Sequence, residues 1–346
     1  TNVATVEITG TVIDTDLDSV TVNGVAATVT GQNWSSSITL TEGPNVVTVT
    51  AKDLENHETT KSITINLDTV VPVISGMTPA DGGVVNIGLV TLSGQATDPN
   101  IETVTVNGAT ASLSGATFSL DVTLSSASNE FTILAKDKAG NEANSTVTIH
   151  YDAEDPILSN IQPTDGTWVN QTAITVSGNV DDDHLDEVLV NGVTASVIGN
   201  LFSAQNVPLT TEGDNSVSIL ATDLAGNTGN ATIALKRDTV IPTISVQPTT
   251  GATGLDPDFK LFVSFDDELS GTSKDTLTIT LDGNNVTSEF SVHDGEAYRT
   301  TNFNLSGGSH TLIATVKDVA DNISIDKSTF EVVDKEKPII LVANVA

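Results

Sequence analysis

The chain repeats its own sequence at intervals of about 84 residues, and this period constrains the fold more than any other feature. The tripeptide Val-Asn-Gly recurs at 22–24, 106–108 and 190–192, and an aromatic residue recurs at Trp34, Phe118 and Phe202. A junction motif, in which Asp is followed four positions later by Pro, recurs at 68–72, 152–156, 238–242 and 334–338. A chain of 346 residues with this period is an array of similar units.

The junction motif sets the boundaries of these units. We expect a first repeat over 1–68, a second over 69–152, a third over 153–238 and a fourth over 239–334, followed by the short segment 335–346. The fourth repeat is the most divergent, because Leu281-Asp282-Gly283 replaces Val-Asn-Gly. In the alignment Thr1 matches Val85, so we expect the first repeat to lack a first strand.

Each repeat carries the pattern of short β-strands. Val47, Val49 and Ala51 alternate with Thr and Lys, which predicts a strand with one buried face. Asn-Gly pairs predict hairpin turns because both residues tolerate a positive φ. Val and Thr are abundant, and no segment shows a sustained helical period. We therefore predict an all-β protein of four tandem immunoglobulin-like β-sandwiches in an extended rod, with Trp34 in a core and Trp168 as a candidate exposed contact.

Charge and composition exclude several classes of function. The chain has 13 Lys and Arg against 45 Asp and Glu, a net charge of -32, which excludes a nucleic-acid or anionic-membrane surface. It has no Cys and no apolar run long enough to span a bilayer. Phosphate loops, Gly-x-Ser-x-Gly and His-Glu-x-x-His are absent from the sequence, and its five His occupy unrelated positions in the repeats. We do not expect an enzyme.

The order of the motifs resembles a known family. Val-Asn-Gly, an aromatic residue, Gly-x-Asn at 213–215, Ala-x-Asp-x-Ala-Gly-Asn at 221–227 and Asp-Thr-x-x-Pro at 238–242 are similar to bacterial immunoglobulin-like repeats. These resemble the second domain of glucodextranase and the tandem repeats of large cell-surface adhesins. The first repeat departs from the pattern at Asn56-His57, where Gly-Asn is expected.

The resemblance implies an extracellular or cell-surface location in a bacterium, and three functions. The first is a structural or adhesive stalk or filament, whose partners are neighbouring repeats or a surface glycan or receptor. The second is a filament subunit that polymerises head to tail, with itself as partner. The third is a carbohydrate-binding accessory region of a secreted polysaccharide hydrolase. The fold alone does not choose among them.

Acidic residues recur at three positions of each repeat: in the loop after the second strand, at the end of the sixth strand, and in the junction motif. The topology of an immunoglobulin-like sandwich brings these positions to one end of the domain. Carboxylates gathered there repel one another, and a hard cation such as Ca²⁺, which binds 6–8 oxygens, would relieve the repulsion. The alternative is that these loops are acidic for solubility and bind no metal.

We expect the candidate calcium ligands in four groups, in the loops and junctions just described. They are Asp68 with Asp98, Asn100, Glu102 and Asp137; Asp152 and Asp155 with Asp182, Asp186 and Asp223; Asp238 with Asp266, Asp267 and Asp318; and Asp14, Asp16 and Asp53, which Asp334 of another molecule would join.

The last 13 residues resemble the first strand of a repeat, because Asp334–Ala346 aligns with Asp68–Ala80. Two interpretations stay open. The sequence is a segment of a longer array, or the apolar run Ile339, Ile340, Leu341 and Val342 completes the first repeat of a second molecule.

Overall fold

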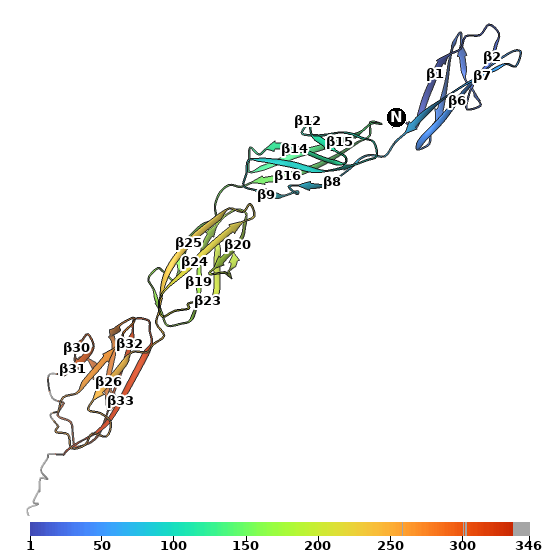
Figure 1. Ribbon diagram of the computed structural model, residues 1–346. Helices are drawn as coiled ribbons and strands as arrows, with labels where there is room; N and C mark the ends of the chain where they lie inside the picture. The colour runs from blue at the N-terminus through green and yellow to red at the C-terminus, as the bar shows by residue number, and fades with distance from the viewer. Residues whose placement is uncertain (258, 300, 302, 335–346) are drawn as a thin grey trace, which may run out of the picture. The chain divides into compact units, whose positions relative to one another are not determined.

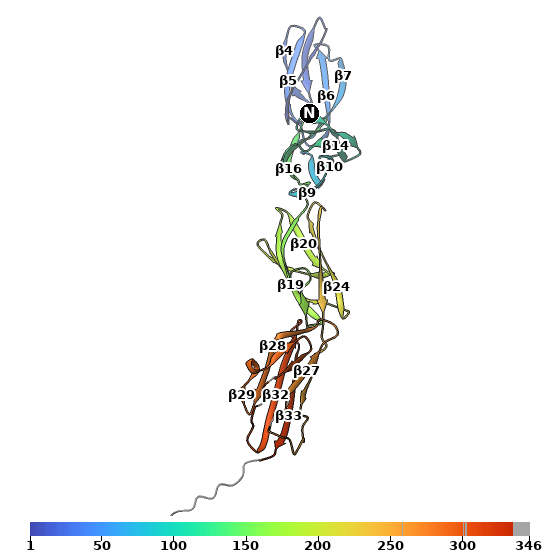
Figure 2. The same ribbon diagram turned by 90° about the vertical axis from the view of Figure 1, so that its left-hand side faces the viewer.

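The computed structural model describes residues 1–257, 259–299, 301 and 303–334. Within these ranges the structure consists of β-strands, turns and one short 3₁₀ segment, η1 (Thr287–Glu289), and each repeat forms two facing sheets (Figure 1 and Figure 2). The prediction of an all-β chain of tandem immunoglobulin-like sandwiches is confirmed. The described residues contain no helix long and apolar enough to cross a membrane.

The chain divides into two compact units, and the first comprises Thr1–Glu154 with Leu224–Gly226. It holds the first two repeats. In the first repeat the sheets have the strand orders β1-β5-β4 and β3-β2-β6-β7, and in the second β13-β14-β10-β8 and β12-β11-β15-β16-β9. The strands are β1 (Thr5–Thr11), β2 (Leu17–Val22), β3 (Val25–Ala26), β4 (Thr28–Thr30), β5 (Asn33–Thr39), β6 (Gly43–Asp53), β7 (Glu58–Leu67), β8 (Val73–Thr78), β9 (Gly83–Val85), β10 (Leu89–Thr97), β11 (Ile101–Val106), β12 (Ala109–Thr110), β13 (Ser112–Ser114), β14 (Thr117–Thr123), β15 (Ser128–Asp137) and β16 (Glu142–Tyr151).

The second unit holds the rest of the described residues and contains the third and fourth repeats. The sheets of the third have the orders β17-β19-β23-β22 and β18-β25-β24-β20-β21, and those of the fourth β26-β27-β31-β30 and β29-β28-β32-β33. The strands are β17 (Ile157–Gln162), β18 (Trp168–Val169), β19 (Ala173–Asp181), β20 (Leu185–Val190), β21 (Val193–Thr194), β22 (Ser196–Ile198), β23 (Leu201–Pro208), β24 (Gly213–Asp223), β25 (Thr228–Arg237), β26 (Thr243–Gln247), β27 (Phe262–Asp266), β28 (Thr272–Leu281), β29 (Asn284–Asn285), β30 (Ser291–His293), β31 (Glu296–Tyr298), β32 (Gly308–Asp318) and β33 (Ile323–Val332).

The turns follow from the residues that the sequence places in them. Asn23 and Gly24 have φ angles of 50° and 81°, and the same pair of positive values recurs at the other two Asn-Gly turns, as the hairpin prediction requires. Asn56 has φ 72° where the second and third repeats have glycine, so asparagine supplies the left-handed residue of this turn.

The core of each sandwich is built from the alternating apolar residues of facing strands. On β6 the predicted inward residue Val47 is buried, and Val49 and Ala51 are half-buried. The equivalent residues of β15 and β24 are buried, as Ile133 and Ile219 illustrate with exposures of 0% and 1%. The recurring aromatic residue packs in the core of its repeat, since Phe118 and Phe202 are buried and Trp34 is 9% exposed. Trp168 is half-buried on β18, and the Lys236 ammonium lies 5.3 Å from the centre of its ring.

The second, third and fourth repeats each begin with a strand that the described part of the first repeat lacks. β8 pairs antiparallel with β10, β17 with β19, and β26 with β27. In the first repeat β1 corresponds to β10, and among the described residues it pairs with β5 alone. Within the described residues β1 is therefore an edge strand of its sheet.

Candidate metal centres

A buried aspartate organises the turn that ends the sixth strand of each of the last three repeats. Asp137 ends β15 and is completely buried. One of its carboxylate oxygens accepts hydrogen bonds from the backbone N–H of Gly140 (2.7 Å) and Asn141 (2.8 Å), and the other accepts one from the Asn141 side chain (2.7 Å). Burial alone would raise the pKa of Asp137, but these hydrogen bonds lower it.

The asparagine of this turn also reaches the junction. The Asn141 side-chain amide donates to the backbone carbonyl of Asp68 (2.8 Å). The Asn322 amide likewise donates to the carbonyl of Asp238 (2.8 Å) as well as to the carboxylate of Asp318 (2.6 Å). The sequence motifs alone did not indicate this contact of either asparagine with the junction. Their recurrence four positions after the strand-end Asp in the last three repeats is the signal that could have shown the second role.

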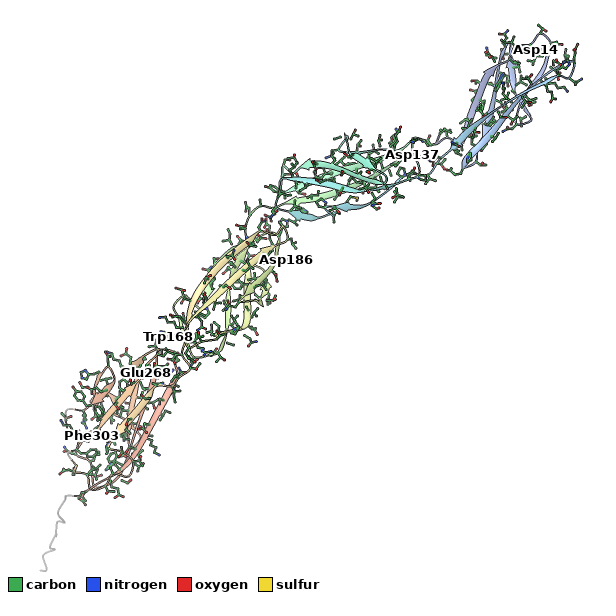
Figure 3. All side chains as sticks on the ribbon, viewed as in Figure 1. Asp14, Asp137, Trp168, Asp186, Glu268 and Phe303 are labelled. Carbon is green, nitrogen blue, oxygen red and sulfur yellow. The ribbon has the colours of Figure 1, made fainter. Side chains whose placement is uncertain are left out.

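The first of the predicted groups forms at the junction that follows the first repeat. Oxygens of Asp68, Asp98 and Asp137 lie within 4.8 Å of one another. One oxygen of Asp98 accepts the N–H of Asn100 (2.6 Å), whereas the other, Oδ2, is buried and accepts no hydrogen bond from any described residue. The Asn100 amide donates to the Asp68 carboxylate (3.0 Å). The group therefore contains a buried carboxylate oxygen without a donor (Figure 3 labels Asp137 at this end of the second sandwich).

An equivalent group forms at the junction that follows the third repeat. Oxygens of Asp238, Asp267 and Asp318 lie within 4.8 Å of one another, and Asp238 and Asp318 are buried. The backbone N–H of Ser270 donates to Asp267 (2.9 Å) and to Asp238 (3.0 Å), which holds the loop against the junction. Burial raises the pKa of Asp318 and the charges of Asp238 and Asp267 raise it further, against the effect of the Asn322 hydrogen bonds.

A third group, in the first repeat, differs in its exposure. Oxygens of Asp14, Asp16 and Asp53 lie within 4.8 Å of one another, and both Asp14 and Asp16 are exposed. Figure 3 labels Asp14 in the first sandwich. A hydrogen bond with Asp14, together with partial burial and the charges of Asp14 and Asp53, raises the pKa of Asp16. His57 takes the place of the turn asparagine, and its Nδ1 lies 2.8 Å from an Asp53 oxygen. Burial alone would raise the pKa of Asp53, but the hydrogen bonds from His57 lower it.

The residues predicted for the junction at Asp152 belong to different units and are described within them. Asp152 lies in the first unit, and Asp155, Asp182, Asp186 and Asp223 lie in the second. Asp223 is buried and accepts two hydrogen bonds from Asn227, each 2.7 Å, so it repeats the turn described for Asp137. Asp182 accepts the backbone N–H of His184 (2.8 Å).

Some candidates lie outside the compact groups. Among the described residues of each unit, the three groups above do not include Glu102, Asp266 or Asp334. All three side chains are exposed: Glu102 lies on β11, Asp266 ends β27, and Asp334 follows β33. Asp155 and Asp186 are exposed. The predicted self-assembly residues Ile339, Ile340, Leu341 and Val342 lie outside the described residues.

A second set of contacts secures the residue that follows the junction Asp, and sequence reasoning missed it. The Thr69 hydroxyl donates to the Glu42 carboxylate (2.9 Å), and the Thr239 hydroxyl donates to that of Glu212 (2.6 Å). The hydroxyl of Thr239 lowers the pKa of Glu212, although burial opposes it. In the second repeat Ser126 and Ala153 stand at the corresponding positions, so the glutamate and the threonine are present together or absent together.

The comparison with known families decides the classification of the chain. The model of the family "Glucodextranase, domain B" matches three segments, 1–69, 72–153 and 156–239, which together exceed half of the sequence. The chain belongs to the glucodextranase domain B family. This membership confirms the resemblance seen in the motifs and covers the first three repeats.

The chain is also similar to parts of individual proteins. Bacillopeptidase F of Bacillus subtilis (strain 168) is 34% identical over 169 residues, which cover 47% of this chain and 11% of that protein. The chain therefore matches a small fraction of that relative's length. The solved structures that the chain matches include titin domains I67–I69 (TM-score 0.42, 11% identity, 77% of this chain and 100% of that chain). The fibronectin(III)-like modules of Clostridium thermocellum CbhA are a second example (TM-score 0.33, 14% identity, 54% of this chain and 100% of that chain).

Proposed function

We propose that this chain is a structural spacer of an extracellular or cell-surface protein, and that Ca²⁺ holds its junctions in a fixed geometry. Membership of the glucodextranase domain B family supports a non-catalytic, structural or accessory role. The spacer role is further supported by the links themselves, because backbone atoms of Asp68 and Asp238 are hydrogen-bonded to side chains of the next repeat.

The observation that carries the calcium proposal is the buried oxygen of Asp98. A buried carboxylate oxygen without a donor costs free energy unless another group compensates it. Here two further carboxylates, Asp68 and Asp137, lie within 4.8 Å. A divalent cation compensates all three, and carboxylate, amide and backbone carbonyl oxygens are the ligands that Ca²⁺ prefers.

Electrostatic repulsion indicates how strongly a cation is needed. Two carboxylates 4–5 Å apart repel by roughly 3–4 kcal/mol at an effective dielectric constant of about 20. The group of Asp238, Asp267 and Asp318 contains three such pairs, and two of its members are buried. Backbone N–H donors reduce this repulsion but carry no formal charge. A bound cation would convert repulsion among the loops into a link between them.

The test is the variant Asp98→Asn. The substitution keeps the oxygen that accepts the N–H of Asn100 and removes the charge that has no donor. In chelator we expect the thermal stability of the chain to be unchanged or higher. With Ca²⁺ we expect the heat of binding and the rise in melting temperature assigned to this junction to disappear, because a ligand of the folded state stabilises by mass action.

Glu102→Gln is the matched control. It removes the same charge from the following strand at an exposed position outside the group. Calorimetric titration of wild-type chain and both variants separates the outcomes. The calcium proposal is wrong if the wild-type chain binds no Ca²⁺, or if the two variants lose the same amount of binding.

A further inference from the structure

The fourth repeat carries three aromatic side chains on the outer face of the sheet β26-β27-β31-β30 (β26, β30 and β31 are labelled in Figure 1). Val263 and Ala297 point into the core and are completely buried, so Phe262 and Tyr298, which alternate with them, point outward. Phe262 stands opposite Tyr298 on the neighbouring strand. The His293 ring stacks on that of Tyr298, with ring centres 5.3 Å apart and planes 17° apart. We call these three residues the aromatic row, which crosses β27, β31 and β30.

The other repeats have no aromatic side chain at the three corresponding positions. The pairs that correspond to Phe262 and Tyr298 in the strand registers are Thr9 and Ser35, Ser93 and Ser119, and Ser177 and Ser203. The residues that correspond to His293 are Thr30, Ser114 and Ile198. Polar side chains are usual where one face of an antiparallel sheet meets water. The sandwich therefore forms without aromatic rings at these positions, and folding alone does not account for the aromatic row.

A hollow with polar walls adjoins the aromatic row on the same sheet. It has a volume of about 280 Å³, and its lining includes Ser245, Ser264 and Asp266. Ser264 follows Phe262 by two positions on β27 and stands opposite Glu296 on β31, so both share the outer face with the rings. Binding sites for small molecules combine apolar surface with a few polar groups in this way.

The charges of this face select the kind of ligand. Within the four strands of the sheet, the charged side chains that point outward are Asp266 and Glu296, and both are exposed. The nearest turn adds no free cation, because the Lys274 ammonium is paired with Asp294 there (2.9 Å). Carboxylate oxygens accept hydrogen bonds and repel anions. A neutral ligand rich in hydroxyl groups complements both the rings and the carboxylates.

We propose that the aromatic row binds a linear chain of neutral, equatorially linked hexopyranose units that lies across the strands. Such units have flat C–H faces that pack on aromatic rings, and rim hydroxyls that donate hydrogen bonds to carboxylates such as Glu296. Neighbouring strands are about 4.8 Å apart, close to the length of one hexose unit in an extended chain. Successive units therefore meet the rings of Phe262 and Tyr298, and the hydroxyls beside them reach Ser264 and Asp266.

Fluorine NMR of the full chain tests this site directly. The chain has two tyrosines, Tyr151 in the second repeat and Tyr298 in the aromatic row, so fluorotyrosine labelling gives two resonances that Tyr298→Phe assigns. The labelled chain is titrated with cellohexaose and with chitohexaose, which share the linkage and differ in the acetamido group. We expect a saturable shift of the Tyr298 resonance with at least one of them, and an unchanged Tyr151 resonance. The hexaose that binds identifies glucose or N-acetylglucosamine as the unit.

Two results of this titration would overturn the proposal. One is a Tyr298 resonance that neither hexaose moves, and the other is an equal shift of both tyrosines. Hexagalacturonate, a chain of acidic units, tests the charge argument. It should bind at least about tenfold more weakly than the neutral hexaose, and equal affinity would overturn the assignment to a neutral chain.

Variants separate contact with the sugar from a merely structural role of the rings. Phe262→Leu and His293→Leu keep an apolar side chain but remove a ring, and each should weaken binding at least about fivefold. His293→Tyr keeps a ring and should bind at least as tightly as the wild-type chain. Leu201→Ser is the control, since Leu201 is 60% exposed on β23, on the corresponding face of the third repeat. Circular dichroism checks the folding of each variant, and leucine variants that bind like the wild-type chain would overturn the proposal.

Discussion

The buried carboxylate of Asp137 offers a sharp test of how the turns hold the junctions. Asp137→Ala removes the acceptor of three hydrogen bonds, two from backbone N–H groups and one from the Asn141 side chain. Hydrogen bonds to a charged group contribute about 1.5–3 kcal/mol each, and their losses are not additive. Asn141 keeps its bond to the carbonyl of Asp68. We therefore expect a loss of about 3–5 kcal/mol in the stability of the second repeat without metal.

Hydrogen exchange followed by mass spectrometry measures this loss in one repeat at a time. A loss of about 3–5 kcal/mol corresponds to amide exchange that is faster by roughly two to four orders of magnitude in β15 and β16. The amides of β24, in the third repeat, are the internal standard. Asp121→Ala is the matched control because Asp121 is exposed on β14 and accepts one hydrogen bond, from Thr91. We expect less than about 1 kcal/mol from that change.

The exchange rates of β15 and β16 in Asp137→Ala decide whether the turn depends on this carboxylate. An increase of less than about tenfold in β15 and β16 would mean that the turn does not depend on its carboxylate, and the reasoning about its hydrogen bonds would be wrong.

The pH dependence of stability is a second check on the role of Asp137. Because the pKa of Asp137 is lowered on folding, its stabilisation is present above the pKa of an unfolded Asp, near 3.8, and is lost as the pH falls through the folded value.

Two further predictions concern other polar contacts. His310 is buried, and its Nδ1 lies 2.6 Å from the Asp282 carboxylate. Burial alone would lower the pKa of His310, but the hydrogen bonds to Asp282 and to the Ser306 carbonyl raise it above 6.5. The contribution of this pair to folding stability is complete below pH 6.5 and is lost as the pH rises through the folded pKa of His310. Asp282→Asn should therefore flatten the pH dependence of amide exchange in β32. An unchanged pH profile would contradict the role given to the His310–Asp282 pair. Glu212→Gln removes the charged acceptor of the Thr239 hydroxyl and should speed exchange of the amides at 239–241 roughly tenfold, whereas Glu187→Gln should leave them unchanged.

The parts of the fold that depend on neighbouring residues could be predicted from the sequence. Asn23-Gly24 specifies its hairpin because both residues accept a positive φ, and the alternation on β15 specifies which residues are buried. The recurrence of Asp at equivalent positions was enough to place Asp68, Asp98 and Asp137 in one group. These inferences need only local geometry and the order of strands in a sandwich.

The parts that depend on distant partners could not be predicted in the same way. Asn141 has its second partner at Asp68, 73 residues earlier, and nothing local distinguishes this role from that of an ordinary turn residue. Asp266 and Asp267 are adjacent and chemically identical in the sequence, yet Asp266 ends a strand with its side chain exposed while Asp267 lies in the group. One position along the chain decides between the two because Asp266 is the last residue of β27, whereas Asp267 lies in the following loop and accepts the backbone N–H groups of Ser270 and Gly271.

The bond between Glu42 and Thr69 has a consequence for exchanging repeats between proteins. The threonine follows the junction Asp, yet its partner belongs to the sandwich that has just ended, so the natural module extends past the last strand to include it. Val70 and Val71 come next and are 56% and 52% exposed, as Val240 and Ile241 are 55% and 60% exposed after Thr239. The family matches end at 69, 153 and 239, the same places. Recombinant arrays spliced between these exposed residues would keep both the glutamate contact of the outgoing repeat and the proline that starts the incoming one.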